Sequence, residues 1–201
     1  MEDLIADLKQ NGWACMTAET PDLDAIQLMR ECASICAAGD FTQAATGRGS
    51  GLQVRDGIRG DQILWLPPGG ATADQKTWLA RLECFRLAIN QQLFLGLFEY
   101  EGHFAVYPVG SFYKAHLDQH AGARDRILTV ILYLNADWQP GDGGELKLWT
   151  TPQGREGNYQ LIEPRMGTIV CFMSDEFWHE VLPTNKERMS ITGWFRKAPA
   201  A

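Results

Sequence analysis

The stretch Phe112-Tyr-Lys-Ala-His-Leu-Asp118 places a histidine and a carboxylate two positions apart, at the end of a run with strand character. Side chains alternate along a strand, so residues two apart point to the same face. His116 and Asp118 are therefore expected to hold one metal ion through two adjacent coordination positions. The third ligand must come from a distant part of the chain, which requires a fold that brings separate strands together.

Short strand-like runs surround this stretch from about Gly102 onward. They are rich in Val, Ile, Tyr, Phe, Trp and Thr, and they alternate with clusters of Gly, Pro, Asn and Asp, which mark turns. Strands are predicted at 103–107, 112–116, 126–134, 145–149, 159–162, 168–172, 179–181 and 188–195. Many short strands in one half of a chain favour a barrel or jelly roll.

The first half of the chain has a different pattern, with apolar residues at helical spacing. It predicts helices at about 4–12, 20–39 and 74–97 and a short strand at 13–16. Thr20 is expected to cap the second helix, because a hydroxyl cap followed by a proline is a signal for a helix start. Residues 44–59 are rich in glycine and predict a long mobile loop or a flexible hairpin before the third helix.

The composition argues against several classes of protein. The 201 residues are 45% hydrophobic and 21% charged, which is ordinary for one globular domain. A net charge of −7 disfavours nucleic acid as a partner, because phosphate binding requires a basic face. The N-terminus lacks the basic start of a signal peptide, and no stretch has the roughly 18 apolar residues of a membrane span. We therefore expect a cytoplasmic protein without a membrane partner, and the oligomeric state stays open.

His179 is the best candidate for the third metal ligand, because it opens a short apolar strand far along the chain. Two histidines and one carboxylate on one face of an octahedron leave three positions open, which suits non-haem iron(II) with a co-substrate and oxygen. His120 is the rival ligand, since it would share a strand face with His116 and Asp118. Three ligands on one straight strand, however, lie too far apart to reach one ion. His103 is expected to be a strand residue with no catalytic role.

Arg188 leads the last predicted strand and is expected to point into the barrel near the metal. A guanidinium group inside a barrel needs a carboxylate partner, which a bound dicarboxylate can supply. Each of these residues alone has a commoner structural explanation, such as a surface pair, a core histidine or a structural ion pair. Their order and spacing within a strand-rich half favour one shared site.

Together these residues resemble the iron(II)- and 2-oxoglutarate-dependent prolyl 4-hydroxylases, specifically the oxygen-sensing type and its bacterial relatives. The iron triad is shared by the whole superfamily, and the resemblance covers roughly residues 8–197. It also includes four further stretches, of which those with Arg-Gly-Asp and Tyr-Leu-Asn are the more specific. They are Tyr107-Pro-Val-Gly-Ser-Phe-Tyr113, Leu132-Tyr-Leu-Asn-Ala-Asp-Trp138, Gly143-Gly-Glu-Leu146, and Ile58-Arg-Gly-Asp61 followed by Ile63-Leu-Trp65.

The resemblance implies a mixed α and β fold, with a double-stranded β-helix (jelly-roll) core and supporting N-terminal helices. One oxygenase domain would span residues 1–201, with a helical part at 1–101 and the catalytic core at 102–197. The mobile loop at about 44–59 would close over a proline-containing protein segment. The loop residues hypothesised to engage that segment are Arg48, Arg55 and Arg59.

The resemblance also implies roles for individual residues. Iron would be bound by His116, Asp118 and His179. The far carboxylate of 2-oxoglutarate would meet Arg188 and the hydroxyl of Tyr133. The pocket around the co-substrate would be lined by Ile131, Leu146, Val181 and Thr192. The residues expected to edge the active site or approach the substrate are Tyr107, Tyr113, Trp194, Arg126, Asp61 and Arg59, with Asp61 and Arg126 forming a pair that ties the loop to the barrel.

The implied activity is that of a prolyl 4-hydroxylase, which uses iron(II), O2 and 2-oxoglutarate to hydroxylate a proline in a protein substrate, with stimulation by ascorbate. Bacterial relatives suggest elongation factor Tu as that substrate. The loop between Asp118 and Arg126 departs from the family, because it is low in proline and glycine and carries His120. One alternative is an oxygenase that acts on a free amino acid or small metabolite. The alternative of another class is a non-catalytic cupin-like binding module or iron sensor.

Overall fold

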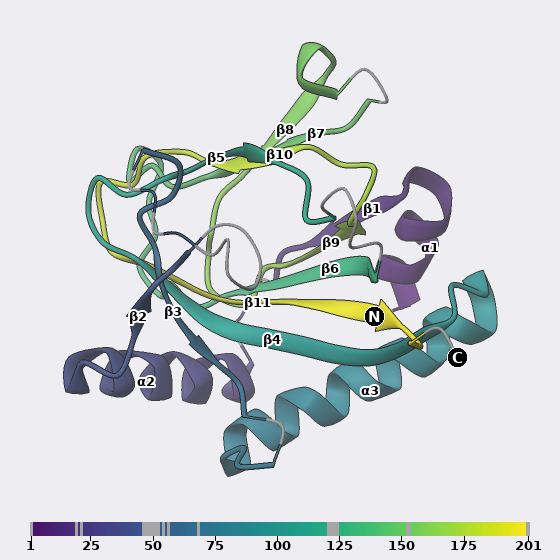
Figure 1. Ribbon diagram of the computed structural model, residues 1–201, viewed down its shortest axis with the longest axis horizontal. Coiled ribbons are helices and arrows are strands. Elements are labelled where there is room, and N and C mark those ends of the chain that lie inside the picture. The colour runs from purple at the N-terminus through teal and green to yellow at the C-terminus, as the bar shows by residue number, and fades with distance from the viewer. Residues whose placement is uncertain are drawn as a thin grey trace.

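The computed structural model describes residues 2–18, 20, 22–45, 53, 55, 57–67, 69–119, 125–151 and 154–199. In this part of the chain, two antiparallel sheets face each other, and three helices lie along the outer side of the larger sheet (Figure 1). The arrangement confirms the mixed fold with a double-stranded β-helix core and supporting N-terminal helices.

The two sheets are built from all parts of the chain. Among the described residues, the larger sheet has seven strands in the order β1-β9-β6-β11-β4-β3-β2, and the smaller has four in the order β5-β10-β7-β8. The strands of the larger sheet are β1 Trp13–Met16, β2 Thr42–Gln43, β3 Gln62–Trp65, β4 Leu97–Tyr107, β6 Arg126–Tyr133, β9 Ile169–Met173 and β11 Arg188–Lys197. The strands of the smaller sheet are β5 Tyr113–His116, β7 Leu146–Trp149, β8 Tyr159–Ile162 and β10 His179–Val181, with the short 3-10 helix η2 at Gly154–Glu156.

All eight strands predicted in the C-terminal half are present, and apart from the start of β4 their ends differ from the prediction by at most two residues. The boundary expected at residue 102 falls inside a continuous strand, because β4 begins at Leu97. The N-terminal part is also more than helical, since β1 pairs with β9 and β3 pairs with β4 in the larger sheet. Most of the loop predicted at 44–59, including Arg48, lies outside the described residues.

The three helices are α1 Glu2–Asn11, α2 Leu23–Ala38 and α3 Ala73–Leu93. The prediction that Thr20 caps α2 is wrong. Asp22 is the cap, and its carboxylate accepts a hydrogen bond from the Ala25 amide at 2.9 Å. An aspartate directly before the first turn satisfies a free helix amide and places negative charge at the positive end of the helix dipole. Gly39 ends the helix with φ of 80°, as its position after the apolar run predicted.

The larger sheet is buried on both faces, and the alternation along β6 shows why. Val130 and Leu132 pack into the core that the sheet forms with the helices. Ile131 and Tyr133, the intervening residues, pack into a second cluster between the two sheets. The run from residue 130 to 133 is therefore continuously apolar, as expected for a strand covered on both sides. None of the helices in the described chain has the length and apolar character needed to cross a membrane.

Two glycines on neighbouring strands make room for the Tyr100 ring on the helix-facing side of the sheet. Gly193 of β11 pairs with Gly102 of β4, and Tyr100 lies across both. A methyl group at Gly193 would collide with the Tyr100 hydroxyl and lie 2.5 Å from the Glu101 carbonyl oxygen. The second contact involves backbone, so it cannot be relieved by a change of rotamer.

We expect Gly193→Ala to lower the free energy of unfolding by about 1–3 kcal/mol, the usual cost of overpacking. Gly69→Ala is the matched control, because a methyl group at Gly69 would meet no atom within 4 Å. Urea denaturation of both variants measures the difference. Equal stability of the two variants would show that the sheet tolerates a side chain at Gly193.

Candidate active site

Two histidines meet across paired strands of the smaller sheet. His116 is the last residue of β5 and His179 is the first residue of β10, and the two are direct partners in the antiparallel ladder. Their ring centres are 4.2 Å apart. Residues directly opposite each other in such a ladder point to the same face, so both imidazoles project into the space between the sheets.

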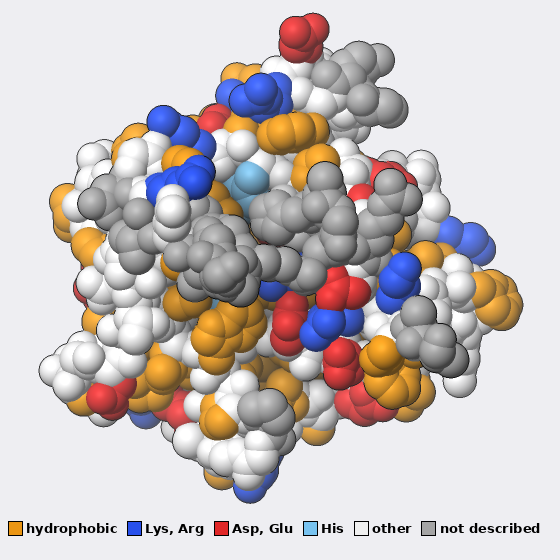
Figure 2. All heavy atoms as spheres, viewed as in Figure 1, with side chains coloured by type: hydrophobic (Ala, Val, Ile, Leu, Met, Phe, Trp, Pro, Cys, Tyr) orange, Lys and Arg blue, Asp and Glu red, His pale blue; other side chains and the backbone are white. Residues whose placement is uncertain are grey.

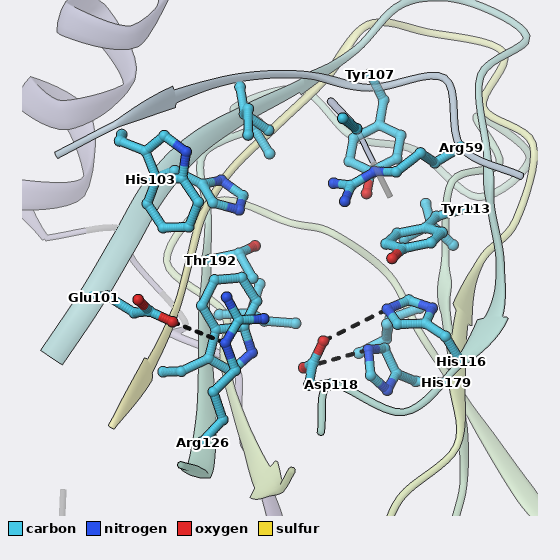
Figure 3. Close-up of a pocket in the computed structure, with 18 of the residues that line it drawn as sticks. Arg59, Glu101, His103, Tyr107, Tyr113, His116, Asp118, Arg126, His179 and Thr192 are labelled. Carbon is cyan, nitrogen blue, oxygen red and sulfur yellow. Dashed lines mark hydrogen bonds and ion pairs between the residues drawn. The ribbon is translucent and has the colours of Figure 1, made fainter. Parts of the chain in front are cut away.

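Asp118 completes the cluster from a bend that follows β5. The expectation that it shares a strand face with His116 is therefore wrong in detail, because the strand ends at His116 and the chain then turns. Its Oδ1 lies 3.6 Å from the Nε2 of His116, and its Oδ2 lies 3.6 Å from the Nε2 of His179 (Figure 3). The three ligand atoms lie within 4.8 Å of one another, so the three side chains form a group that could hold one metal ion.

Hydrogen bonds on the far side of each ring orient the imidazoles. The Nδ1 of His116 lies 2.8 Å from the Lys114 carbonyl oxygen, and the Nδ1 of His179 lies 3.1 Å from the Phe177 carbonyl oxygen. A carbonyl oxygen only accepts, so each Nδ1 carries the proton and each Nε2 presents its lone pair to the cluster. Such bonds fix the tautomer and the ring direction of metal-binding histidines.

Thr129 and Ser174 hold the carboxylate, and sequence reasoning missed both. The Thr129 hydroxyl donates to Oδ2 of Asp118 at 2.7 Å, and the hydroxyls of Thr129 and Ser174 are 2.9 Å apart. Both residues are buried. No motif marks them, and only the alternation of β6 could have suggested that Thr129 faces the same side as Ile131.

The protonation states suit a cation. Burial lowers the pKa of His179 to about 4, and the adjacent His116 adds to the shift while Asp118 opposes it. Burial alone would raise the pKa of Asp118, but the imidazoles of His179 and His116 lower it well below its usual range. A carboxylate beside a neutral imidazole at neutral pH is the ligand form that a metal requires.

Arg188 lies at the other end of the site, in the first position of β11. It is only 2% exposed, its Nε donates to the Gly144 carbonyl oxygen at 2.9 Å, and its guanidinium carbon is 4.8 Å and 4.9 Å from the ring centres of Tyr107 and Tyr133. No carboxylate of the described residues forms an ion pair with it. The Tyr133 hydroxyl is buried and likewise has no hydrogen-bond partner within the described chain.

Buried polar groups are normally paired, and a buried charge without a counterion is costly. A cation without a counterion and a hydroxyl without a hydrogen-bond partner, both among the described residues, therefore fit the far carboxylate of a dicarboxylate ligand. One end of the site thus offers ligand atoms for a metal ion, and the other end offers a positive charge and hydrogen-bond donors for an anion.

A cavity of about 470 Å³ joins the two ends. Its wall includes the metal-binding cluster and most of the other predicted residues. The predicted residues in the wall are Arg188, Ile131, Leu146, Val181, Thr192, Tyr107, Tyr113, Trp194, Arg126 and Arg59. Tyr133 lies fully buried behind it, beside Arg188.

His103 and Trp65 also line this cavity, although neither was assigned to the site by sequence reasoning. His103 lies in β4, as expected of a strand residue, with its ring between the rings of Trp65 and Trp194 at 5.0 Å and 5.5 Å. The rival ligand His120 lies outside the described residues.

The expected pair between Asp61 and Arg126 does not form. Asp61 is fully buried and accepts two hydrogen bonds from Arg59, at 2.7 Å and 2.5 Å. Arg126 instead donates to Glu101 at 2.8 Å, and its guanidinium carbon lies 3.5 Å from the centre of the Trp194 ring. Arg59 is two residues from Asp61 in an extended segment, so it reaches the carboxylate directly. Arg59 still lines the cavity in this pair, and Arg55 is exposed.

Charged residues surround the Arg126 side of the cavity. Arg196 forms ion pairs with Glu99, Glu101 and Asp125, and Glu101 also pairs with Arg126. Figure 2 shows acidic and basic side chains side by side near the middle of one face of the molecule, with a histidine side chain visible above them. Mutual pairing leaves this group fixed in place, so it forms a polar edge to the cavity.

Known proteins share this fold. Residues 102–196 match the 2OG-Fe(II) oxygenase superfamily. A Pseudomonas putida prolyl-4-hydroxylase of known crystal structure is 40% identical, with a TM-score of 0.85 over 98% of both chains. A Trichoplax adhaerens prolyl hydroxylase, solved in complex with a hypoxia inducible factor oxygen degradation domain peptide fragment, shares the fold at 22% identity, with a TM-score of 0.80 over 96% of this chain and 87% of that chain.

A shorter match links the chain to a curated relative. Prolyl 3-hydroxylase OGFOD1 from Xenopus laevis is 36% identical over 86 residues, which are 40% of this chain but only 16% of that protein. The near-complete match to the Pseudomonas putida structure carries more weight, because it spans both chains almost entirely. The chain belongs to the iron(II)- and 2-oxoglutarate-dependent oxygenases, among relatives that are prolyl hydroxylases.

Proposed function

We propose that this protein is a prolyl 4-hydroxylase that uses iron(II), 2-oxoglutarate and O2 to hydroxylate a proline in a protein substrate. The observation that carries the proposal is that one cavity contains both a group of possible metal ligands and a buried arginine without a counterion among the described residues. Three metal donors lie within 4.8 Å of one another, and a buried, unpaired guanidinium lies at the other end. The 40% identity to a prolyl-4-hydroxylase across nearly the whole chain supports the choice of reaction.

The bound iron, 2-oxoglutarate and O2 supply the oxidising chemistry, which side chains alone do not provide. His116, Asp118 and His179 would hold the metal on one side and leave its other positions facing the cavity. Arg188 and Tyr133 would bind the far carboxylate and so fix the direction of the co-substrate. This division lets the protein orient the reactants without taking part in the oxidation.

The remaining cavity residues exclude water and receive the substrate. Ile131, Leu146 and Val181 form an apolar wall next to the co-substrate position. Trp194 and Tyr113 also line the cavity and would lie beside the bound substrate. A cytoplasmic location and stimulation by ascorbate are both part of the proposal, since both would help to keep the iron reduced.

Two other functions predict different results. An oxygenase for a free amino acid or small metabolite would use the same donors, but Trp65, 47% exposed at the cavity, favours contact with a larger partner. A cupin-like binding module or iron sensor would not need a buried arginine without a counterion. Turnover of 2-oxoglutarate separates this second alternative from both oxygenases.

Loss of one metal ligand should abolish the activity. We expect His179→Ala to reduce 2-oxoglutarate-dependent succinate formation by more than about a hundredfold, since even changes behind a ligand weaken metal sites by about 10–100-fold. Cys84→Ala, on the exposed surface of α3, is the control and should match the unmodified protein. Unchanged turnover in the His179 variant would exclude this metal site.

Replacing Arg188 should weaken the binding of dicarboxylates but not of monocarboxylates. We expect Arg188→Met to weaken 2-oxoglutarate binding about 10–100-fold, because a hydrogen bond to a charged group contributes about 1.5–3 kcal/mol. Binding of 2-oxopentanoate, which lacks the far carboxylate, should change little. Calorimetric titration of both ligands gives the comparison, and an equal loss for both would assign Arg188 a structural role only.

Mass spectrometry tests the substrate class. Candidate proteins, with elongation factor Tu first among them, would be incubated with the enzyme, iron(II), 2-oxoglutarate and ascorbate. We expect one added oxygen on a single proline of one protein, and none with the His179→Ala variant. Oxidation of a free amino acid, with no modified protein, would favour the small-molecule alternative.

A further inference from the structure

One short segment of the chain contacts both sheets beside the metal-binding cluster. We call residues 58–61 the clasp. The clasp runs along β5, where the Lys114 amide donates to the Ile58 carbonyl oxygen at 2.9 Å and the Gly60 amide donates to the Phe112 carbonyl oxygen at 3.0 Å. The chain then continues directly into β3 of the larger sheet. The clasp therefore ties the strand that carries His116 to the opposite sheet.

Close contact at Gly60 shows that the clasp has little freedom. A methyl group at this position would lie 3.0 Å from the Ser111 hydroxyl oxygen and 3.2 Å from its Cβ. That hydroxyl also donates to the Gly60 carbonyl oxygen at 3.1 Å. The backbone of the clasp is thus bonded to the chain just before β5 as well as to β5 itself.

The side chains of the clasp continue this contact to the metal ligand. The guanidinium carbon of Arg59 lies 4.3 Å from the centre of the Tyr113 ring. The Tyr113 ring in turn stacks on the His116 ring, with centres 3.7 Å apart and planes 19° apart. Figure 3 shows Arg59, Tyr113 and His116 in this order along one side of the cavity. Asp61, fully buried, fixes the guanidinium with two hydrogen bonds.

His116 needs such support more than His179 does. The His179 side chain is 6% exposed and its ring lies 4.7 Å from that of Phe172, so the core restrains it. The His116 side chain is 16% exposed and has a single hydrogen bond, about which the ring could still tilt. Metal ligands must be held within about 0.5 Å and 10–20° of their working geometry. The Tyr113 ring stacks on the His116 ring and is itself covered by the Arg59 guanidinium, so it supplies the restraint that His116 lacks.

We propose that Arg59 is a positioning residue for the metal site: held by Asp61, it presses the Tyr113 ring against His116 and so directs the Nε2 of His116 toward the ion. The inference rests on the proposed iron site but goes beyond it, because Arg59 touches neither metal nor co-substrate in this role. It makes metal affinity depend on a residue outside the catalytic β-helix strands.

Cobalt(II) titration tests this without turnover. We expect Arg59→Lys and Tyr113→Leu each to weaken cobalt(II) binding about tenfold, the lower end of the range for residues that orient metal ligands. The visible absorption of the bound cobalt should also change, because it reports the ligand geometry. Tyr113→Phe keeps the stacked ring and should keep both the affinity and the spectrum. Lysine at position 59 keeps a positive charge beside the buried Asp61, which limits the loss of stability.

Arg81→Lys is the matched control. Arg81 also pairs with aspartates, Asp22 and Asp24, and lies 6.0 Å from the Trp78 ring, but it is on α3 and is not part of the cavity wall. It should bind cobalt(II) as the unmodified protein does. Thermal denaturation of the metal-free variants separates a general loss of stability from a specific loss of affinity.

The outcomes distinguish the two proposals. If the unmodified protein binds no cobalt(II), the proposed function fails at the metal site. If it binds one equivalent and the Arg59→Lys and Tyr113→Leu variants bind equally well, the iron site stands and the positioning role is overturned. A loss of affinity in Tyr113→Phe as large as in Tyr113→Leu would also overturn it, since the ring would not be the source of the effect.

Discussion

The pairing of β5 with β10 is the constraint on which the site depends. It places His116 and His179 directly opposite each other, so that two residues far apart in sequence offer their lone pairs to one point. A shift of this register by one residue would turn one imidazole to the other face of the sheet. The bend after β5 then returns Asp118 to the same point. A short and slightly irregular pair of strands thus decides whether the protein can hold a metal.

The larger sheet sets the length of the site, because two of its strands run along it with alternate residues facing the cavity. On β6, Thr129 holds the metal-binding carboxylate, Ile131 lines the middle, and Tyr133 lies beside Arg188. From residue 129 to residue 133 an extended strand covers about 13 Å. Trp194 and Thr192 of β11 pair with Thr129 and Ile131, so the neighbouring strand follows the same course. The distance between the metal-binding cluster and the arginine is therefore set by backbone pairing along these strands.

The sequence was sufficient to predict the eight strands of the core and the convergence of His116, Asp118 and His179, but not the contacts that hold these side chains. Strand alternation and turn residues are local signals, and the His-x-Asp pair is close in sequence, so both can be read directly. Asp61 pairs with the nearby Arg59, while the expected partner Arg126 is drawn to Glu101 and the Trp194 ring, which lie on other strands. The support of Asp118 by Thr129 and Ser174 likewise depends on strands that only the fold brings together.

The charges of the site are arranged at a cost to stability that the ligands would offset. Asp118 is a buried anion whose neighbours include a neutral imidazole, and Arg188 is a buried cation without an anion among the described residues. Buried charges without full compensation are destabilising in a folded chain. A divalent cation at one end and a dicarboxylate at the other would satisfy both. The folded protein is therefore least stable when the cavity is empty. Binding of the metal and the co-substrate should raise the free energy of unfolding as well as prepare the reaction.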